Sequence, residues 1–290
     1  MDGIIIINKG KNCTSHDVVY KVKKILNEKI GHTGTLDPNA TGVLPLLIGK
    51  GTLISKYLIN HDKIYEATIK LGIQTDTADS EGRIIKEDIN VRIESEEETK
   101  KILKSFIGKQ EQIPPMYSAI KVNGKKLYEY ARKGERVDIS PRKIEIYDIE
   151  LKNIDYKTKE IKFVVKCSKG TYIRSLCENI AQELNTVGYM KELKRIQVGE
   201  FNIENSITIE ELHKNKEDQE YINNKIITIE NFFENKEKII LNDNQIKMYL
   251  NGVKLEQKKS DDVYRIYDLN NRFIGIGTIE CYKLKRDVVL

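Results

Sequence analysis

The most informative stretch of the sequence is Gly31-His32-Thr33-Gly34-Thr35-Leu36-Asp37-Pro38-Asn39-Ala40-Thr41-Gly42. Its three glycines and its proline predict a shaped loop rather than a regular helix or strand. Asp37 is the only carboxylate of the stretch, and Pro38 disfavours helical geometry for the residue before it. An Asp-Pro pair alone usually marks a turn in which the aspartate bonds nearby backbone. A loop of this kind on a rigid scaffold can instead present a catalytic acid.

Composition limits the class of protein. The chain has 290 residues, 39% hydrophobic and 32% charged, which is enough for a sizeable core and more than one domain. A net charge of +5 is compatible with a nucleic-acid partner. No apolar run approaches the ~18 residues of a membrane span, so we expect a cytoplasmic protein without membrane attachment. The four cysteines and four histidines lack zinc-like spacing, which predicts reduced thiols and no metal site.

Periodicity predicts the elements around the loop. A buried strand is expected at residues 3–8, and a helix capped by Ser15 is expected to end near Glu28. A buried apolar run covers 43–48, and a second helix is expected over 52–59. Residues 63–72 alternate like a half-buried strand that places Tyr65 on the face of Ala67, Ile69 and Leu71. Residues 74–82 are too short for a calcium loop and predict a structural turn.

The second half alternates between strands and helices. Ser95 opens a helix that ends near Phe106, strands are expected at 142–153 and 160–167, and a helix follows to about Leu184. Arg174 falls in the first turn of that helix, where the helix dipole does not favour a cation, so a specific partner is expected. A polar connector with one or two helices covers 202–235. A small module follows, with a helix near 242–250 and strands at 263–268 and 272–282.

One segment concentrates the positive charge. From Lys121 to Lys143 there are eight Lys or Arg residues against three acids, which leaves +5 in 23 residues. Tyr117, Tyr128 and Tyr130 lie in or beside it. Cations for phosphates and rings for unstacked bases are what single-stranded RNA binding needs. An exposed hairpin with ordinary solvated lysines is the alternative.

Several blocks together resemble one family. The central stretch resembles the G-H-T-G-x-L-D-P-x-A-T-G signature of the TruB family, the bacterial tRNA pseudouridine-55 synthases. Further blocks resemble the family's K-x-Y-x-A motif at 63–67, its T-x-T-x-D-x-E-G turn within 74–82, a block that runs from Gln112 to Lys121, G-T-Y-I-R-S-L at 170–176 and L-x-R-T-x-x-G-x-F at 193–201. Three positions depart from the family pattern: Gly10 stands where the family has proline, Asn12 where it has glycine, and Ile196 where it has threonine.

The resemblance implies an architecture. It implies the α+β pseudouridine synthase fold, with a mixed, mainly antiparallel sheet flanked by helices. Residues 1–235 would form the catalytic domain, with a mobile thumb insertion at about 115–142 that grips RNA. Residues 236–290 would form a small PUA-like RNA-binding β domain.

The resemblance also implies an activity. Such an enzyme isomerises uridine 55 in the T-loop of tRNA to pseudouridine, as a monomer, without metal or cofactor. Asp37 would be the catalytic residue, with Arg174 paired to it and Tyr65 packed on the target base. His32 would occupy the space that the flipped base leaves. Lys9, which would support the loop or a phosphate, and Leu193 complete the substrate-binding set.

The chemistry fits these residue types, and two alternatives stay open. Breaking a glycosidic bond calls for an ionised carboxylate beside the sugar, and a nearby arginine lowers a carboxylate's pKa. One alternative is a noncatalytic tRNA-binding or tRNA-folding protein on the same scaffold, which would not need Asp37. The other is a nucleoside hydrolase, which usually uses two acids where this sequence offers one candidate.

Overall fold

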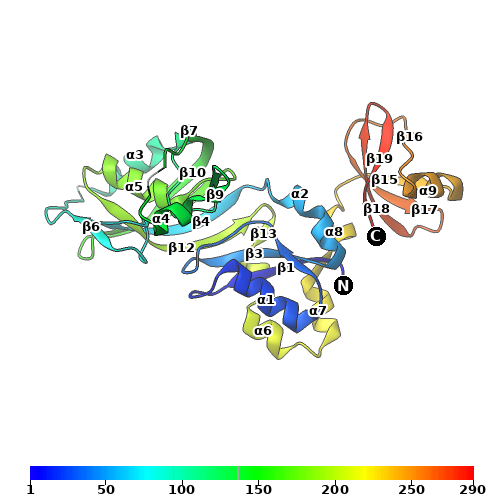
Figure 1. Cartoon of the computed structure of the whole chain (residues 1–290), viewed down its shortest axis with the longest axis horizontal. Helices are drawn as coiled ribbons and strands as arrows, with labels where there is room; N and C mark the ends of the chain where they lie inside the picture. Colours follow the sequence, from blue (N-terminus) through cyan, green and yellow to red (C-terminus); the bar gives the residue numbers. More distant parts are fainter. Residues whose placement is uncertain (94, 136) are drawn as a thin grey trace.

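The chain forms a large sheet with flanking helices and a smaller sheet near one end (Figure 1). The structure is a computed structural model and describes residues 1–93, 95–135 and 137–290. Arg136, counted above in the basic segment, therefore lies outside the described residues. Among those described, every helix is too short or too polar to traverse a bilayer.

The large sheet is mixed and mainly antiparallel, which confirms the predicted fold class. Within the described residues it has ten strands. One pair, β12 (Gly188–Val198) with β3 (Thr41–Ile48), is parallel, and the remaining neighbours are antiparallel. The main path, in spatial order, is β14 (Ile226–Thr228), β1 (Gly3–Lys9), β3 (Thr41–Ile48), β12 (Gly188–Val198), β4 (Lys63–Leu71), β11 (Glu160–Cys167), β10 (Arg142–Asp155) and β7 (Gly108–Gln112). Two short strands pair at its side, β2 (Ile30–His32) with β3 and β13 (Phe201–Asn202) with β12.

Strand β1 has isoleucine at consecutive positions because both of its faces are buried. Ile4 and Ile6 pack on one face of the sheet, towards the cluster that includes Phe201 and Phe233. Ile5 and Ile7 pack on the other face, against helix α1 (Ser15–Leu26). A strand buried on both faces needs apolar side chains at every position rather than at alternate ones.

Helix α1 begins one residue earlier than predicted. Thr14, not Ser15, is the N-cap, and it forms a reciprocal capping box with Asp17. The helix ends at Leu26 rather than near Glu28, because Asn27 adopts the left-handed conformation. Ser15 is buried, and its hydroxyl bonds both the amide (2.9 Å) and the carbonyl (3.2 Å) of Leu36. The first turn of α1 therefore supports the central loop.

Strand β4 confirms the predicted alternation. Tyr65, Ala67, Ile69 and Leu71 share one buried face. Helix α5 (Ile173–Glu183), also predicted, packs its apolar side against this face, and helix α3 (Glu96–Ser105) contributes Leu103 to the same core. Cys167 and Cys177 lie in this core, where burial raises the pKa of both thiols, that of Cys167 to about 12.

Two predicted segments differ in detail. The helix expected over 52–59 is a 3-10 helix, Gly49–Ile54, followed by the single turn α2 (Ser55–Leu58). The connector holds a 3-10 turn (Ile203–Asn205) and three short helices, α6 (Ile209–Lys214), α7 (Gln219–Lys225) and α8 (Ile229–Phe232). It also contributes β14, an unpredicted strand that pairs with β1.

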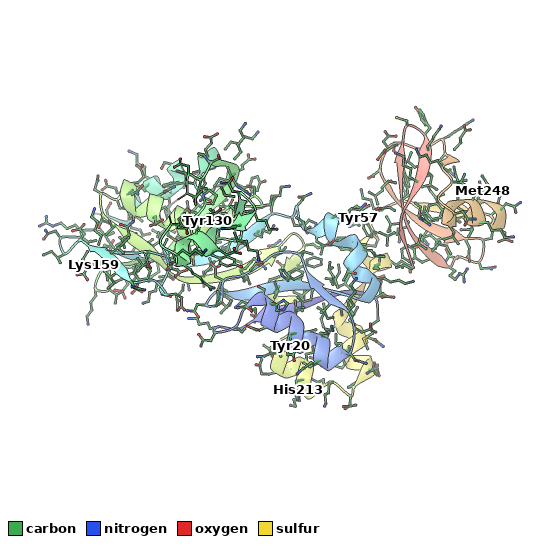
Figure 2. All side chains as sticks on the ribbon, viewed as in Figure 1. Tyr20, Tyr57, Tyr130, Lys159, His213 and Met248 are labelled. Carbon is green, nitrogen blue, oxygen red and sulfur yellow. The ribbon has the colours of Figure 1, made fainter. Side chains whose placement is uncertain are left out.

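Two hairpins extend from the body. Strands β5 (Ile73–Thr75) and β6 (Ile84–Glu87) flank the predicted turn. In the segment predicted to form the thumb insertion, β8 (Lys121–Val122) and β9 (Lys125–Lys126) lead into α4 (Leu127–Arg132), which includes Tyr130, labelled in Figure 2. The ring of Tyr128 lies 5.3 Å from the Lys126 ammonium and 5.4 Å from the Arg132 guanidinium.

The smaller sheet starts at Lys238. Its spatial order is β15 (Lys238–Leu241), β17 (Val263–Asp268), β18 (Phe273–Glu280), β19 (Lys283–Val289) and β16 (Leu255–Glu256), and α9 (Asp243–Leu250) packs beside it. The strand predicted over 272–282 ends at Glu280, because Cys281 and Tyr282 turn the chain with positive φ into β19. Tyr57, labelled in Figure 2, links the end of α8 to the smaller sheet: its ring packs edge-on against Phe233, the C-cap of α8, and its hydroxyl bonds Asp287 of β19.

We expect Gly42→Ala to lower the free energy of unfolding by about 3 kcal/mol. Gly42 has φ +104°, and an added Cβ would lie 2.1 Å from the backbone oxygen of Arg195 on the neighbouring strand β12. Backbone in a paired strand cannot move aside. Urea unfolding measures the effect, with Gly10→Ala as control, where an added Cβ meets no described atom within 4 Å. Equal stability of the two variants would contradict this account.

Candidate active site

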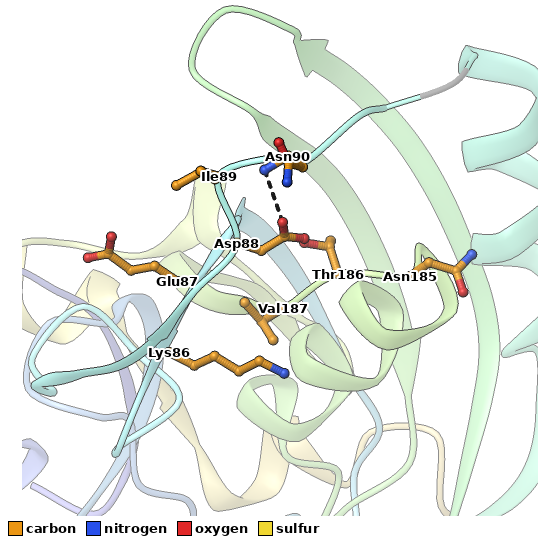
Figure 3. A pocket seen from close by; sticks show the side chains of 8 residues that line it. All are labelled: Lys86, Glu87, Asp88, Ile89, Asn90, Asn185, Thr186 and Val187. Carbon is orange, nitrogen blue, oxygen red and sulfur yellow. Dashed lines mark hydrogen bonds between the residues drawn. The ribbon is translucent and has the colours of Figure 1, made fainter.

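Two of the surface hollows bear on the choice of site. The first is lined by a turn whose polar groups already bond one another. It has a volume of about 370 Å³ and lies between β6 and the start of β12 (Figure 3), lined by residues 86–90 and 185–187. Its Asp88 carboxylate already accepts the Asn90 amide at 3.0 Å and the Thr186 hydroxyl at 2.7 Å. These bonds lower the pKa of Asp88 and fix the turn. The predicted site residues lie elsewhere.

The second hollow collects most of them. It is a cleft of about 720 Å³, walled by residues 33–37, strands β4 and β12, the root of the thumb at 117–119, and the segment 168–174 that leads into α5. Four predicted site residues line it: Asp37, Tyr65, Arg174 and Leu193. Residues 137 positions apart in the chain, Asp37 and Arg174, thus meet in one place.

Asp37 and Arg174 form a two-pronged ion pair. Arg174 Nε lies 3.2 Å from Asp37 Oδ2, and Nη2 donates to Oδ1 at 3.4 Å. A planar guanidinium facing both oxygens fixes the direction of the carboxylate as well as its distance. The Arg174 side chain is only 7% exposed, whereas that of Asp37 is 37% exposed. The Asp37 carboxylate therefore keeps one side open to the cleft, while the Arg174 guanidinium is buried.

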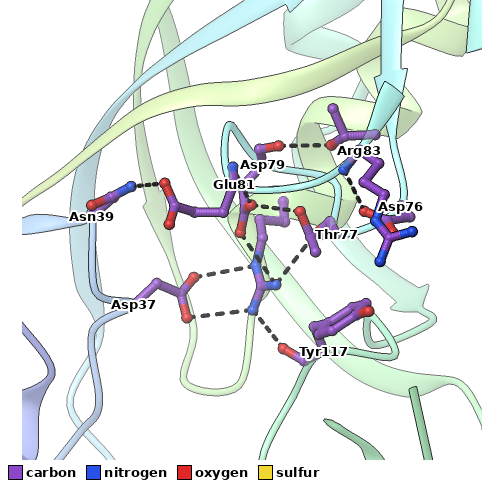
Figure 4. A network of polar contacts seen from close by, with 10 residues as sticks. Asp37, Asn39, Asp76, Thr77, Asp79, Glu81, Arg83 and Tyr117 are labelled. Atoms are coloured by element: carbon purple, nitrogen blue, oxygen red, sulfur yellow. Dashed lines mark hydrogen bonds and ion pairs between the residues drawn. The ribbon is translucent and has the colours of Figure 1, made fainter. Parts of the chain in front are cut away.

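Other contacts hold the guanidinium itself. Nη1 lies 3.5 Å from Asp79 Oδ2 and donates to the Thr77 carbonyl at 3.3 Å, and Nη2 donates to the Tyr117 carbonyl at 2.9 Å. Figure 4 shows Asp37, Thr77, Asp79 and Tyr117 converging on this point. The specific partner expected for an arginine in the first turn of α5 is thus a pair of carboxylates and two carbonyls.

Asp79 is a second acid beside the pair, and the sequence placed it in the predicted structural turn at 74–82 without a role at the site. Its Oδ1 accepts the Thr77 hydroxyl at 2.6 Å and the Glu81 amide at 3.0 Å, while Oδ2 faces Arg174. Its side chain is 15% exposed, and it is not among the residues that line the cleft. Asp79 therefore organises the turn and the arginine rather than facing a ligand.

The pKa of Asp37 moves opposite to expectation. The sequence predicted that Arg174 would lower it, but burial raises the pKa above the ordinary 3.8, and the nearby Asp79 charge raises it further. Arg174 and Lys9 oppose this rise without cancelling it. Arg174 thus acts on the pKa in the predicted direction, but the net pKa is raised because desolvation of the carboxylate outweighs the attraction of its partner.

Lys9 supports the loop from below. Its side chain is fully buried, and its ammonium donates to three carbonyl oxygens, those of Gly10 (2.9 Å), Cys13 (2.7 Å) and Pro38 (2.9 Å). Burial lowers its pKa. With all three protons directed at carbonyls, Lys9 acts on the peptide next to Asp37 and does not face the cleft.

Arg195 supports the same loop from strand β12, although the sequence predicted no role for it at the site. It is 2% exposed, and its guanidinium donates to the carbonyls of Val43 (2.8 Å), Gly34 (3.2 Å) and Thr35 (3.5 Å). The sequence predicted no strand at 188–198, and the available signal was the place of Arg195 in the L-x-R-T-x-x-G-x-F block. The structure makes it a buried arginine in a central strand. A buried arginine must find buried acceptors, and here they are backbone carbonyls on both sides of Asp37.

The remaining predicted residues differ in position. Tyr65 is 8% exposed, lines the cleft from β4, and has a pKa raised by burial. Leu193 lines the same wall from β12, opposite Ala67 in register. His32 ends the short strand β2, so the irregular loop covers 33–40 rather than the whole stretch. His32 is exposed and is not among the cleft-lining residues. Partial desolvation of its ring and the nearby Arg195 charge lower its pKa.

Among the described residues, no group of three or more His, Cys, Asp or Glu side chains has the arrangement of a metal site. All four cysteines are free thiols.

Comparisons with known families cover almost the whole chain. A model of the TruB family pseudouridylate synthase N-terminal domain matches residues 22–173. A model of the tRNA pseudouridylate synthase B C-terminal domain matches 174–234, and one of the pseudouridine synthase II TruB C-terminal region matches 238–283.

Individual relatives agree. A protein of Clostridium kluyveri named tRNA pseudouridine synthase B is 44% identical over 292 residues, 98% of each chain. A protein of the same name from Francisella tularensis is 41% identical, over 98% of this chain and 93% of its own.

Solved structures share the fold. The structure titled as a Cbf5-Nop10-Gar1 complex matches with a TM-score of 0.70 and 28% identity, over 99% of this chain and 83% of the other. An H/ACA RNP bound to a substrate RNA containing 2'-deoxyuridine matches with a TM-score of 0.68 and 27% identity, over 99% and 84%. On the full-length identity to curated relatives and the matching domain models, this chain belongs to the TruB family of pseudouridine synthases.

Proposed function

We propose that this chain isomerises uridine 55 in the T-loop of tRNA to pseudouridine, with Asp37 as the catalytic residue. The observation that carries the proposal is the two-pronged Asp37–Arg174 pair, which faces an open cleft beside Tyr65 in a TruB family member. The relatives' name, tRNA pseudouridine synthase B, supports tRNA as the substrate.

The reaction sets demands that these residues meet. The bond from N1 of uracil to C1′ breaks, the base turns, C5 joins C1′, and the proton on C5 is lost while N1 gains one. The product is an isomer, so no group leaves and no electron is transferred. Asp37 supplies the ionised carboxylate beside the sugar. A target base must be flipped out of its loop to reach it, and the flat ring of Tyr65 gives that base a surface for stacking.

The surroundings suit a macromolecular substrate. The thumb insertion presents Lys125, Lys126 and Arg132 around two tyrosine rings, which suits phosphates and unstacked bases. We further propose that residues 236–290 act as a separate PUA-like RNA-binding domain and that the protein works as a cytoplasmic monomer. Lys9 takes a supporting role under the loop in this proposal, since its protons all face carbonyls.

Tritium release tests the proposal. A T-arm RNA carrying 5-³H-uridine is incubated with the native chain, because joining C5 to C1′ expels the label. We expect release from this RNA, none from an RNA with cytidine at position 55, and pseudouridine in the digested product. A noncatalytic binding protein would bind the RNA tightly without release. A hydrolase would yield free uracil instead of pseudouridine.

The pKa of Asp37 makes the acid side of the pH profile informative. The carboxylate must be ionised to act, and its pKa is raised above 3.8. Activity is therefore expected to rise with pH through a midpoint above that of an ordinary aspartate. Single-turnover rates from about pH 3 to pH 8, with RNA binding checked at each pH, measure it. A midpoint at or below 3.8 would contradict the burial argument.

A further inference from the structure

The start of helix α5 is tied to the chain that enters the thumb insertion. Gln112, the last residue of β7, is 3% exposed, and its side-chain amide pairs with the backbone of Tyr172 in both directions. Nε2 donates to the Tyr172 carbonyl at 3.0 Å, and Oε1 accepts the Tyr172 amide at 2.8 Å. Tyr172 is the N-cap of α5 and makes no capping bond through its own side chain. Gln112 therefore holds the helix start from outside.

Two more hydrogen bonds join the start of α5 to the segment 112–117. The Ser175 hydroxyl donates to the Ile113 carbonyl at 2.9 Å, and Arg174 donates to the Tyr117 carbonyl at 2.9 Å. Residues 172, 174 and 175 thus each bond the segment 112–117. Any displacement between the segment and the helix start would alter the direction in which Arg174 projects.

The segment is stiff and continues into the thumb insertion. Pro114 and Pro115 lie between the two anchored ends, and each ring fixes its own φ. The next carbonyl, that of Ser118, accepts the amide of Tyr128 at 3.1 Å from helix α4. A short rigid piece of chain therefore connects the thumb helix, the Arg174 guanidinium and the first turn of α5.

We propose that Gln112 is a positioning residue for the isomerisation: by fixing the start of α5 against the root of the thumb, it sets the Arg174 guanidinium in line with both oxygens of Asp37. The inference rests on the proposed function. Gln112 does not line the cleft and so acts through Arg174 rather than on the RNA. Small errors in the placement of catalytic groups are costly, since a shift of about 1 Å can reduce a rate 10²-fold.

The test compares Gln112→Ala with Gln110→Ala. Gln110 lies two residues away on the same strand, and its amide donates only to the Phe106 carbonyl at 2.7 Å. We expect Gln112→Ala to lower kcat for T-arm RNA about 10- to 100-fold, with the RNA dissociation constant within about twofold of native. Gln110→Ala should match the native chain in both.

The pH profile separates positioning from a general structural effect. A misplaced Arg174 opposes the raised pKa of Asp37 less well, so the acid limb of the Gln112→Ala profile should move to higher pH, while that of Gln110→Ala stays. Equal kcat and equal acid limbs for the two variants would overturn the inference.

A second variant covers poor folding. Gln112→Glu keeps the shape and the acceptor for the Tyr172 amide but loses the donor to the Tyr172 carbonyl, and we expect at least a fivefold loss of kcat in the folded protein. A native kcat in Gln112→Glu would equally overturn the inference. Absence of tritium release by the native chain would instead refute the proposed function, so the two failures are distinguishable.

Discussion

Asp37→Asn is expected to lower kcat for T-arm RNA by at least about 10⁴-fold while leaving the RNA dissociation constant within about threefold of native. Asparagine has the shape of aspartate and still offers one oxygen to Arg174, so the loop can keep its form. It lacks the negative charge and the nucleophilic or basic oxygen that the reaction needs. Arg174 also keeps its contacts to Asp79 and to two carbonyls.

The measurement is tritium release under single-turnover conditions, with binding followed in parallel by filter retention. Asp76→Asn is the matched control, because Asp76 is an exposed carboxylate in the neighbouring turn that accepts the Arg83 amide at 2.8 Å. The control should release tritium at the native rate. Substantial release by Asp37→Asn, confirmed by pseudouridine in the product, would remove Asp37 from the catalytic role.

Arg174→Lys is expected to lower kcat about 10²- to 10³-fold although the charge is conserved. A lysine ammonium is a point charge on a flexible stem and cannot face two carboxylates and two carbonyls at once. We expect the carbonyls of Thr77 and Tyr117 to lose their donor, which would lower the free energy of unfolding by about 1–3 kcal/mol. The Asp37 carboxylate would also lose its fixed direction.

Two readouts distinguish this variant from simple unfolding. Thermal denaturation shows that the protein is folded at the assay temperature, and the acid limb of activity should move to higher pH because the cation that opposes the raised pKa of Asp37 is less well placed. Arg83→Lys, an exposed arginine at the same turn, is the control. A native rate for Arg174→Lys would show that charge alone, without the fork geometry, is sufficient.

Much of the fold was predictable because burial imposes a period on the sequence. Strand β4 alternates since one face meets α5 and α3, and β1 is uniformly apolar since both faces are covered. The cap of α1 was misplaced by one residue because Thr14 and Ser15 can both cap. In the structure Ser15 bonds the backbone of Leu36, which lies 21 positions along the chain, and Thr14 caps the helix.

Other features left no local signal. The turn after β18 needs positive φ at two residues, for which Asn or Gly is usual, yet Cys281 and Tyr282 supply it. Strand β14 has three residues, and its pairing partner lies more than 200 positions away. At the site, sequence resemblance brought Asp37, Tyr65 and Arg174 forward, but Arg195 and Asp79 act on backbone and on other side chains, which only the folded arrangement brings near.

The strand order has a consequence for synthesis on the ribosome. In the large sheet, β12 lies between β3 and β4 and pairs with both. In the chain, β12 begins 117 residues after β4 ends at Leu71. At about 5–20 residues per second, translation takes on the order of 10 s to cover that gap. During that interval the facing edges of β3 and β4 have unpaired backbone groups, which are open to pairing with other nascent chains. The sheet, and with it the cleft, is therefore completed late in the synthesis of each chain.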